Sequence, residues 1–211
     1  MDSNPTSLSI AFIGASLGPL YLVDPEQGAC SQLLEAFLIA DAEQLGREWP
    51  FVDDSEAAAL IAQMKQGLGG DPDEMVWEFR RLFAIGPTPK PAPPWGSYYT
   101  DREGAICSVA TLELRRWLAA QGIGQAAGDG KVEDHVGHML TLMSWMALNA
   151  PNLLPEFLSR HFLVWTEHFL GILQDSTAHP FYLGLAALTN ASLCGIRDEL
   201  QLSITYPRFY R

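Results

Sequence analysis

Residues 133–147 read "EDHVGHMLTLMSWMA" and carry no Asp, Glu, Lys or Arg after the second position. Their apolar side chains recur three and four positions apart, which is the spacing of one face of an α-helix. Two such faces are present: the first consists of Val136, Met139, Leu140, Met143 and Met146, and the second of His135, His138, Leu142 and Trp145. A helix that is apolar on two faces is buried on two faces. The stretch therefore predicts an interior helix of an all-helical protein.

A second helix is predicted from the signals in residues 67–86, "GLGGDPDEMVWEFRRLFAIG". Asp71 has the position of an N-cap, Pro72 that of the first helical residue and Glu74 that of a capping box. One apolar face follows, and it comprises Met75, Phe79, Leu82 and Phe83. The Gly-Pro pair at positions 86–87 then ends the helix, because proline disfavours helical geometry in the residue before it.

Helical spacing extends over most of the rest of the chain. Near the N-terminus it is shown by Leu8, Phe12 and Ala15, and further helices are predicted around residues 108–120, 158–172 and 181–202. No run of alternating polar and apolar residues is long enough for a sheet. The sequence therefore predicts one compact all-α domain over residues 1–211, with a candidate hinge in the glycine-rich segment 121–131.

The chain is acidic, with a formal net charge of −12. This charge disfavours DNA, RNA and anionic membranes as partners, and it suits a basic peptide or a cation. The alternative is that the charge only keeps the protein soluble. We therefore expect no nucleic-acid partner.

The cysteines and the N-terminal region indicate the cellular compartment of the protein. Cys30, Cys107 and Cys194 are widely spaced and odd in number, which favours buried free thiols in a reducing environment. The first basic residue is Arg47, so the apolar N-terminal stretch has no positive region before it, as a secretory signal would. The uncharged stretches 135–155 and 176–196 contain polar residues and proline, which favours buried helices over membrane spans. We expect a cytoplasmic protein without stable membrane insertion.

Motifs for catalysis are weak. The glycines at 67–70 precede a helix, but that helix opens with acidic residues that would repel phosphate. Glu133, Asp134, His135 and His138 could share a metal ion, although acidic residues in a first helical turn also complement the helix dipole. A metal-dependent enzyme built on these four residues is kept as an alternative. No motif of a nucleophilic hydrolase is present.

Residues 86–104, "GPTPKPAPPWGSYYTDREG", interrupt the helical pattern with prolines followed by aromatic residues. The segment could be a polyproline ligand for an SH3-like module, a rigid spacer, or one wall of a groove that receives a peptide. The first interpretation requires an exposed and mobile loop. The third requires an apolar surface that is already in place before the peptide arrives.

Four stretches resemble the TorD/DmsD family, cytoplasmic chaperones for molybdenum-cofactor oxidoreductases with twin-arginine leaders. They read "FRRLFAIGPTPKPAPPWGSYYTDREG" at 79–104, "EDHVGHMLTLMSWMA" at 133–147, "LSRHFLVWTEHFL" at 158–170 and "HPFYLGLAALT" at 179–189. The resemblance covers almost the whole chain in the right order. P-P-W-G-S and E-D-H are its most specific parts, and P-P-W-G-S points to the branch that binds the leader of DMSO reductase.

The resemblance implies a chaperone that is not an enzyme and needs no cofactor or metal. It would bind the signal peptide of the catalytic subunit of a DMSO-reductase-like molybdoenzyme, and would hold that subunit back from export until its cofactor is inserted. Further partners that it suggests are the Tat translocase and cofactor-insertion proteins. The leader-binding residues expected here are Phe79, Leu82, Phe83, Pro94, Trp95, Tyr98, Asp134 and His135. Secondary candidates are Tyr21, Pro93, Gly96, Ser97, Asp101, Glu133 and His138.

Two positions depart from the family pattern. Phe79 stands where Trp is frequent, which keeps the apolar face but loses an indole donor. Val132 stands where Pro usually precedes E-D-H, so the start of that helix is less fixed. The residue types nevertheless suit a leader, because a basic pair followed by an apolar run needs carboxylates beside an apolar groove.

Overall fold

A computed structural model describes residues 4–84, 90–123 and 133–211. None of these residues belongs to a β-strand, and Trp95 and His135 form an isolated antiparallel bridge. The predicted all-α fold is confirmed. The elements in chain order are α1 (Pro5–Leu22), the 3₁₀ turn η1 (Pro25–Gln27), α2 (Ser31–Ile39), α3 (Ala42–Glu48), α4 (Asp54–Leu68), α5 (Pro72–Leu82), α6 (Gly96–Thr100), α7 (Val109–Ala120), α8 (Val136–Asn149), α9 (Leu154–Phe157), the π-helical turn η2 (Leu158–Phe162), α10 (Leu163–Ser176) and α11 (Pro180–Glu199).

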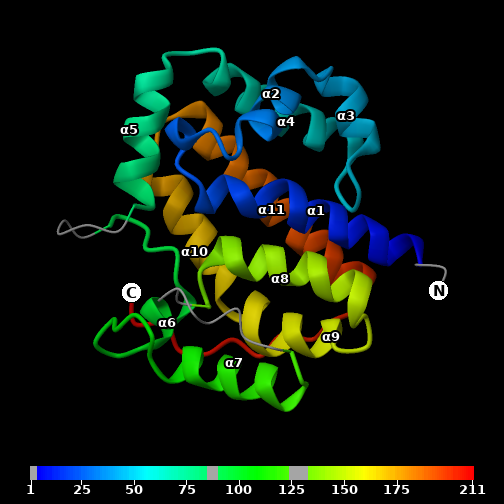
Figure 1. Ribbon diagram of the computed structural model, residues 1–211, viewed down its shortest axis with the longest axis vertical. Coiled ribbons are helices and arrows are strands. Elements are labelled where there is room, and N and C mark those ends of the chain that lie inside the picture. The colour runs from blue at the N-terminus through cyan, green and yellow to red at the C-terminus, as the bar shows by residue number, and fades with distance from the viewer. Residues whose placement is uncertain (1–3, 85–89, 124–132) are drawn as a thin grey trace.

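Helices α1 and α8 cross the middle of the molecule side by side, with α2, α3 and α4 at one end and α6, α7 and α9 at the other (Figure 1). Glycines bring the two central helices into close contact. A Cβ atom on Gly14 would lie 2.3 Å from the carbonyl oxygen of Leu140, and one on Gly18 would lie 3.0 Å from that of Gly137. Since glycine has no side chain, the two backbones can approach at this short distance.

The first apolar face of α8 is buried as predicted, since Val136, Met139, Leu140, Met143 and Met146 are all 0% exposed. The exposure of the second face increases along the helix. His135 is buried, His138 and Leu142 are partly exposed, and Trp145 is 45% exposed. The prediction that both faces are buried is therefore wrong at the far end of the second face, where no described element covers the helix.

Helix α5 begins as predicted. The carboxylate of Asp71 accepts a hydrogen bond from the backbone N–H of Asp73 at 3.0 Å, and Pro72 is the first helical residue. Its apolar face is buried, with Met75, Phe79, Leu82 and Phe83 at most 6% exposed. The helix ends at Leu82, and the Gly-Pro pair at 86–87 lies outside the described residues.

Helix α1 buries a different face from the one that the spacing of Leu8, Phe12 and Ala15 suggested. Leu8 and Phe12 are 52% and 43% exposed, because the two glycines turn the opposite side of the helix toward α8. Within the described part of the chain, α1 is the one helix long and apolar enough to cross a membrane by length and composition. Half of it is buried in the fold, and core helices of soluble proteins pass the same test, so the feature carries no membrane assignment.

The cysteines are all free, but only Cys30 is buried and Cys194 is partly buried. Cys107 is exposed, so the expectation of buried thiols is wrong at that position. The hinge predicted at 121–131 lies outside the described residues from position 124 onward. That hinge and the single-domain assignment remain predictions.

Candidate functional site

The two most specific motifs, at 93–97 and 133–135, lie against each other. The backbone N–H of Val136 donates to the carbonyl oxygen of Pro94 at 2.8 Å, and that of Gly96 donates to the carbonyl oxygen of Asp134 at 3.1 Å. These two bonds form the bridge between Trp95 and His135. The start of α8 and the start of α6 are thereby held as one unit.

The buried side chain of Asp134 stabilises this unit through hydrogen bonds. Its carboxylate accepts hydrogen bonds from the backbone N–H of Ser97 at 2.6 Å and from the hydroxyl of Thr111 at 3.0 Å. The side chain is buried, and burial raises its pKa, while the bonds from Ser97 and Thr111 act in the opposite direction. Asp134 therefore joins α6, α7 and α8, and it offers no free carboxylate to a partner at the surface.

His135 is the N-cap of α8. Its Nδ1 accepts a hydrogen bond from the backbone N–H of Gly137 at 3.1 Å, and its ring meets that of Trp95 edge to face at 5.3 Å. Burial, with a smaller contribution from the charge of His138, lowers the pKa of His135 to about 3. The imidazole is therefore neutral at physiological pH.

The proline-rich connection is buried at its C-terminal end. Pro93, Pro94 and Trp95 are all buried, and the hydroxyl of Tyr99 donates to the carbonyl oxygen of Pro93 at 2.7 Å. A Cβ atom on Gly96 would lie 2.5 Å from the indole of Trp165, so this contact requires glycine. The interpretation as an exposed SH3 ligand is contradicted for residues 93–95, while positions 87–89 lie outside the described residues.

The candidates on α5 lie in the core rather than on a surface. Phe79, Leu82 and Phe83 are at most 4% exposed, and Phe83 contacts the ring of Tyr21 at 5.5 Å. Tyr21 in turn lies near Phe169, which also contacts Tyr99. The hydroxyl of Tyr21 is hydrogen-bonded to Thr189 at 2.9 Å, and burial raises its pKa. A continuous set of buried rings thus connects α5 with α6.

The remaining candidates have polar or backbone partners. Ser97 is fully buried and its hydroxyl accepts from the backbone N–H of Cys107 at 3.2 Å. Asp101 is at the surface, where it accepts from the backbone N–H groups of Glu103 and Ala105. Tyr98 is half-buried beside it.

Glu133 pairs with Arg115 at 2.6 Å through one carboxylate oxygen, and the other oxygen is buried without a hydrogen-bond partner. No group of three or more His, Cys, Asp or Glu side chains in the described ranges is arranged to hold a metal ion. Asp134 and His135 use their acceptor atoms within the fold. The alternative of a metal-dependent enzyme therefore finds no support in the geometry of these residues.

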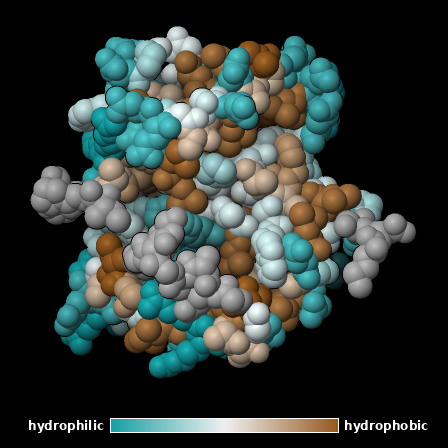
Figure 2. Space-filling view, in the orientation of Figure 1, coloured by the Kyte–Doolittle hydropathy of each residue, from teal (hydrophilic) through white to brown (hydrophobic). Residues whose placement is uncertain are grey.

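Two exposed tryptophans mark surfaces where a partner could bind. Trp145 and Leu148 of α8 are 45% and 49% exposed and continue the face that begins at His135. Hydrophobic residues and residues of intermediate hydropathy are interspersed at the surface over the middle of this side of the molecule (Figure 2). Sequence spacing placed Trp145 on an apolar face but could not show that the face stays uncovered.

Trp77 of α5 is 64% exposed and lines a surface pocket of about 480 Å³ between α5 and the start of α11. Glu78, Arg81 and His179 also line it, and Arg81 lies over the ring of Trp77 at 5.8 Å. None of the sequence patterns indicated this pocket. The signal was present, because Trp77 lies off the apolar face of a helix whose other large apolar residues are buried.

Comparison with known proteins assigns the chain to a family. The sequence profile of the nitrate reductase delta subunit family matches residues 52–171, a span that contains both motifs of the bridge. The chain belongs to this family. The resemblance to TorD and DmsD proteins drawn from the motifs is confirmed.

Its curated relatives are named as chaperones. It is 33% identical to the Tat proofreading chaperone DmsD of Salmonella typhimurium over 92% of both chains. It is 34% identical to the probable Tat proofreading chaperone DmsD of Haemophilus influenzae over 98% of both, and 26% identical to the chaperone protein YcdY of Escherichia coli over 88% of this chain and 92% of that protein. A putative redox enzyme maturation protein from Archaeoglobus fulgidus has a TM-score of 0.49 at 17% identity, covering 95% of this chain and 96% of that one. The chain is a chaperone-family protein rather than an enzyme, as predicted.

Proposed function

We propose that the protein binds the twin-arginine leader of the catalytic subunit of a DMSO-reductase-like molybdoenzyme in the cytoplasm. By holding the leader it would delay export of that subunit until the cofactor is inserted. The observation that carries the proposal is the bridge between Trp95 and His135, which joins the two family motifs at the head of an apolar helix face. Relatives at 33–34% identity that are named Tat proofreading chaperones support the same function.

We propose further that the leader lies along the outer face of α8. This face begins at the Trp95–His135 pair and continues through His138 and Leu142 to Trp145, which is 45% exposed. A helix-prone apolar run in the leader would cover these side chains in the way that amphipathic helices fill hydrophobic grooves. The net charge of −12 would attract the basic pair of the leader.

The buried candidates then have a supporting role. Asp134, Phe79, Leu82 and Phe83 would fix the shape of the binding surface without contacting the peptide, because their side chains are buried. A surface that is rigid before binding loses little conformational entropy when the peptide arrives. Substitutions at these positions would therefore affect folding and binding together.

Calorimetric titration with a synthetic twin-arginine leader tests the proposal on exposed residues. Trp145→Ala should weaken binding about tenfold, since an exposed tryptophan at the centre of a peptide site is a typical hot spot. Trp77→Ala is the matched control, an exposed tryptophan on another helix, and should leave the affinity unchanged. Absence of any binding to the folded wild-type protein would contradict the proposed function.

The opposite result in these two variants would favour a second site. If Trp77→Ala weakens leader binding and Trp145→Ala does not, the pocket between α5 and α11 is the leader site. Its tryptophan ring beside Glu74 and Glu78 is suited to a cationic side chain, although Arg81 already lies on that ring. The Tat translocase and cofactor-insertion proteins are further partners of this proposal, to be tested by co-purification.

A further inference from the structure

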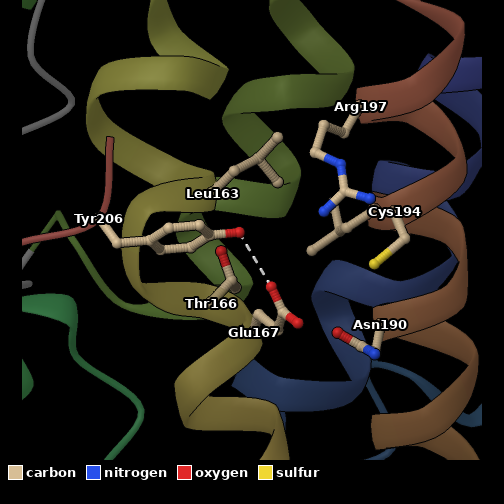
Figure 3. A pocket seen from close by; sticks show the side chains of 8 residues that line it. Leu163, Thr166, Glu167, Asn190, Cys194, Arg197 and Tyr206 are labelled. Atoms are coloured by element: carbon tan, nitrogen blue, oxygen red, sulfur yellow. Dashed lines mark hydrogen bonds between the residues drawn. The ribbon is translucent and has the colours of Figure 1, made fainter. Parts of the chain in front are cut away.

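Residues 201–211 leave α11 without regular secondary structure and return across α10 to α6, where the C-terminus is marked in Figure 1. Tyr206 of this tail reaches over the groove between α10 and α11, and its hydroxyl donates to the carboxylate of Glu167 at 3.0 Å (Figure 3). A cavity of about 20 Å³ lies beneath it, beside Cys194 and Arg197. Phe209 then stacks on His168, with ring centroids 4.2 Å apart and planes 3° apart.

The end of the tail lies on α6, the helix that begins directly after Trp95. The backbone N–H of Tyr210 donates to the carbonyl oxygen of Tyr99 at 3.0 Å. The guanidinium of Arg211 donates to the carbonyl oxygen of Glu103 at 2.9 Å and reaches those of Asp101 and Arg102 at 3.4 and 3.5 Å. It also lies over the ring of Tyr98 at 5.3 Å.

The acceptors around this guanidinium are fixed by the turn that carries them. The carboxylate of Asp101 accepts from the backbone N–H groups of Glu103 and Ala105 at 2.8 and 3.1 Å. Gly104 has φ +71°, and a Cβ atom there would lie 2.5 Å from the Arg211 guanidinium carbon. Three carbonyl oxygens and one aromatic face thus surround a planar cation, an arrangement that suits arginine better than lysine.

No residue of the tail is fully buried, although Leu202, Ile204 and Phe209 are partly buried against the core. Tyr206 and Tyr210 are 48% and 42% exposed, and Arg208 and Arg211 are also exposed. Segments with few buried apolar contacts detach locally at low free energy while the remainder of a protein stays folded. The contact between Arg211 and the 101–104 turn can therefore open without unfolding α6.

We propose that the turn at 101–104 and the ring of Tyr98 form an arginine-binding subsite. Arg211 of the same chain occupies this subsite in the free protein, and one arginine of a bound leader displaces it. The inference rests on the proposed leader-binding function, and it adds where one leader arginine binds and what competes with it. Tyr98 follows Trp95 by three residues, so the subsite adjoins the bridge at the head of α8. A tail that fills the subsite in about nine molecules of ten lowers the apparent affinity for the leader about tenfold.

Two arginine variants of the full chain separate competition from a structural role. Arg211→Ala empties the subsite, whereas Arg208→Ala removes the same charge from a side chain that lies over Tyr210 within the tail itself. Calorimetry with a twin-arginine leader should show binding about tenfold tighter for Arg211→Ala and unchanged for Arg208→Ala. Equal affinities for Arg211→Ala and the wild type, or weaker binding by Arg211→Ala, would overturn the inference.

A second measurement does not depend on any leader. N-acetyl-arginine amide should bind Arg211→Ala saturably and shift the NMR resonances of the Tyr98 ring, and N-acetyl-lysine amide should have less effect. The wild type, with its subsite filled, should respond only weakly. If Arg211→Ala is folded by circular dichroism and still shows no response, the proposed subsite is contradicted. If the leader binds no variant but arginine amide still binds Arg211→Ala, the proposed function fails while the subsite stands.

Discussion

Two segments that contain aromatic residues meet at α6, and their environments are opposite. Residues 92–97 are buried, with Ala92 and Ser97 0% exposed, whereas the tail at 201–211 is mostly exposed despite Tyr206, Phe209 and Tyr210. Aromatic content therefore does not decide burial here. What differs is the backbone, because a buried segment must satisfy every N–H group and a segment at the surface can leave this to water.

Prolines make the burial of the first segment less costly. Pro93 and Pro94 have no N–H group. The N–H groups of Gly96 and Ser97 donate to the carbonyl oxygen and to the carboxylate of Asp134. The tail contains one proline, at 207. After Leu202, its main-chain bonds to the other described residues of the protein are those of the Tyr210 N–H to Tyr99 and of the Arg211 carbonyl oxygen to Nε2 of His168. The first segment should therefore be part of the cooperative core, and the tail should not.

The largest effect at neutral pH is expected at Asp134. Asp134→Ala leaves the buried N–H of Ser97 and the hydroxyl of Thr111 without an acceptor, so the free energy of unfolding should fall by about 3 kcal/mol. Asp134→Asn keeps one acceptor oxygen and should lose about half as much. Urea denaturation measures both. Equal, small losses in the two variants would show that the segment is not held by this carboxylate.

A pH-dependent effect is expected from His135, on the other side of the bridge. Burial lowers its folded-state pKa to about 3, while an unfolded histidine titrates near about 6.5. Only the unfolded state takes up a proton between these values, so the stability present at neutral pH is lost as the pH falls from about 6.5 toward about 3. The slope approaches about 1.4 kcal/mol per pH unit.

His135→Asn tests this dependence, because Asn is a favoured N-cap that can still accept from Gly137 but does not titrate. Urea denaturation at several pH values should give a flatter profile than the wild type. His161→Asn is the comparison. Burial lowers the pKa of His161 to about 4, so its contribution to the loss of stability is complete at a higher pH than that of His135. An unchanged profile in His135→Asn would place the pH sensitivity elsewhere.

The smallest effect is expected in the tail. Phe209→Ala removes the stack on His168 and should reduce the free energy of unfolding by less than about 1 kcal/mol. Hydrogen exchange should accelerate at the Tyr210 N–H, which is bonded to Tyr99, and stay unchanged along α8. Faster exchange in both places would mean that the tail belongs to the cooperative core and that the contrast between the segments does not hold.

Local signals predicted several helices and missed others. They did not indicate α3 or α4, and the expectation that residues 86–104 interrupt the helices is wrong at Gly96–Thr100, which form α6. The start of α5 followed from Asp71 and Pro72, because capping involves groups within one helical turn. The spacing of Leu8 and Phe12 indicated a helix but not its buried face, since Gly14 and Gly18 bring α8 against the other side. Likewise, the motif at 133–135 indicated a functional region, but spacing could not reveal that Asp134 points into the protein.

The sequence by itself determined the all-α class, the start of α5 and the family, because each depends on residues that are close along the chain. Only the tertiary structure decided that Trp95 lies against His135, that Trp145 stays exposed, and that Arg211 lies on a turn 110 residues before it. Those facts depend on how helices pack and on which backbone groups find partners, and no local pattern of residue types records either.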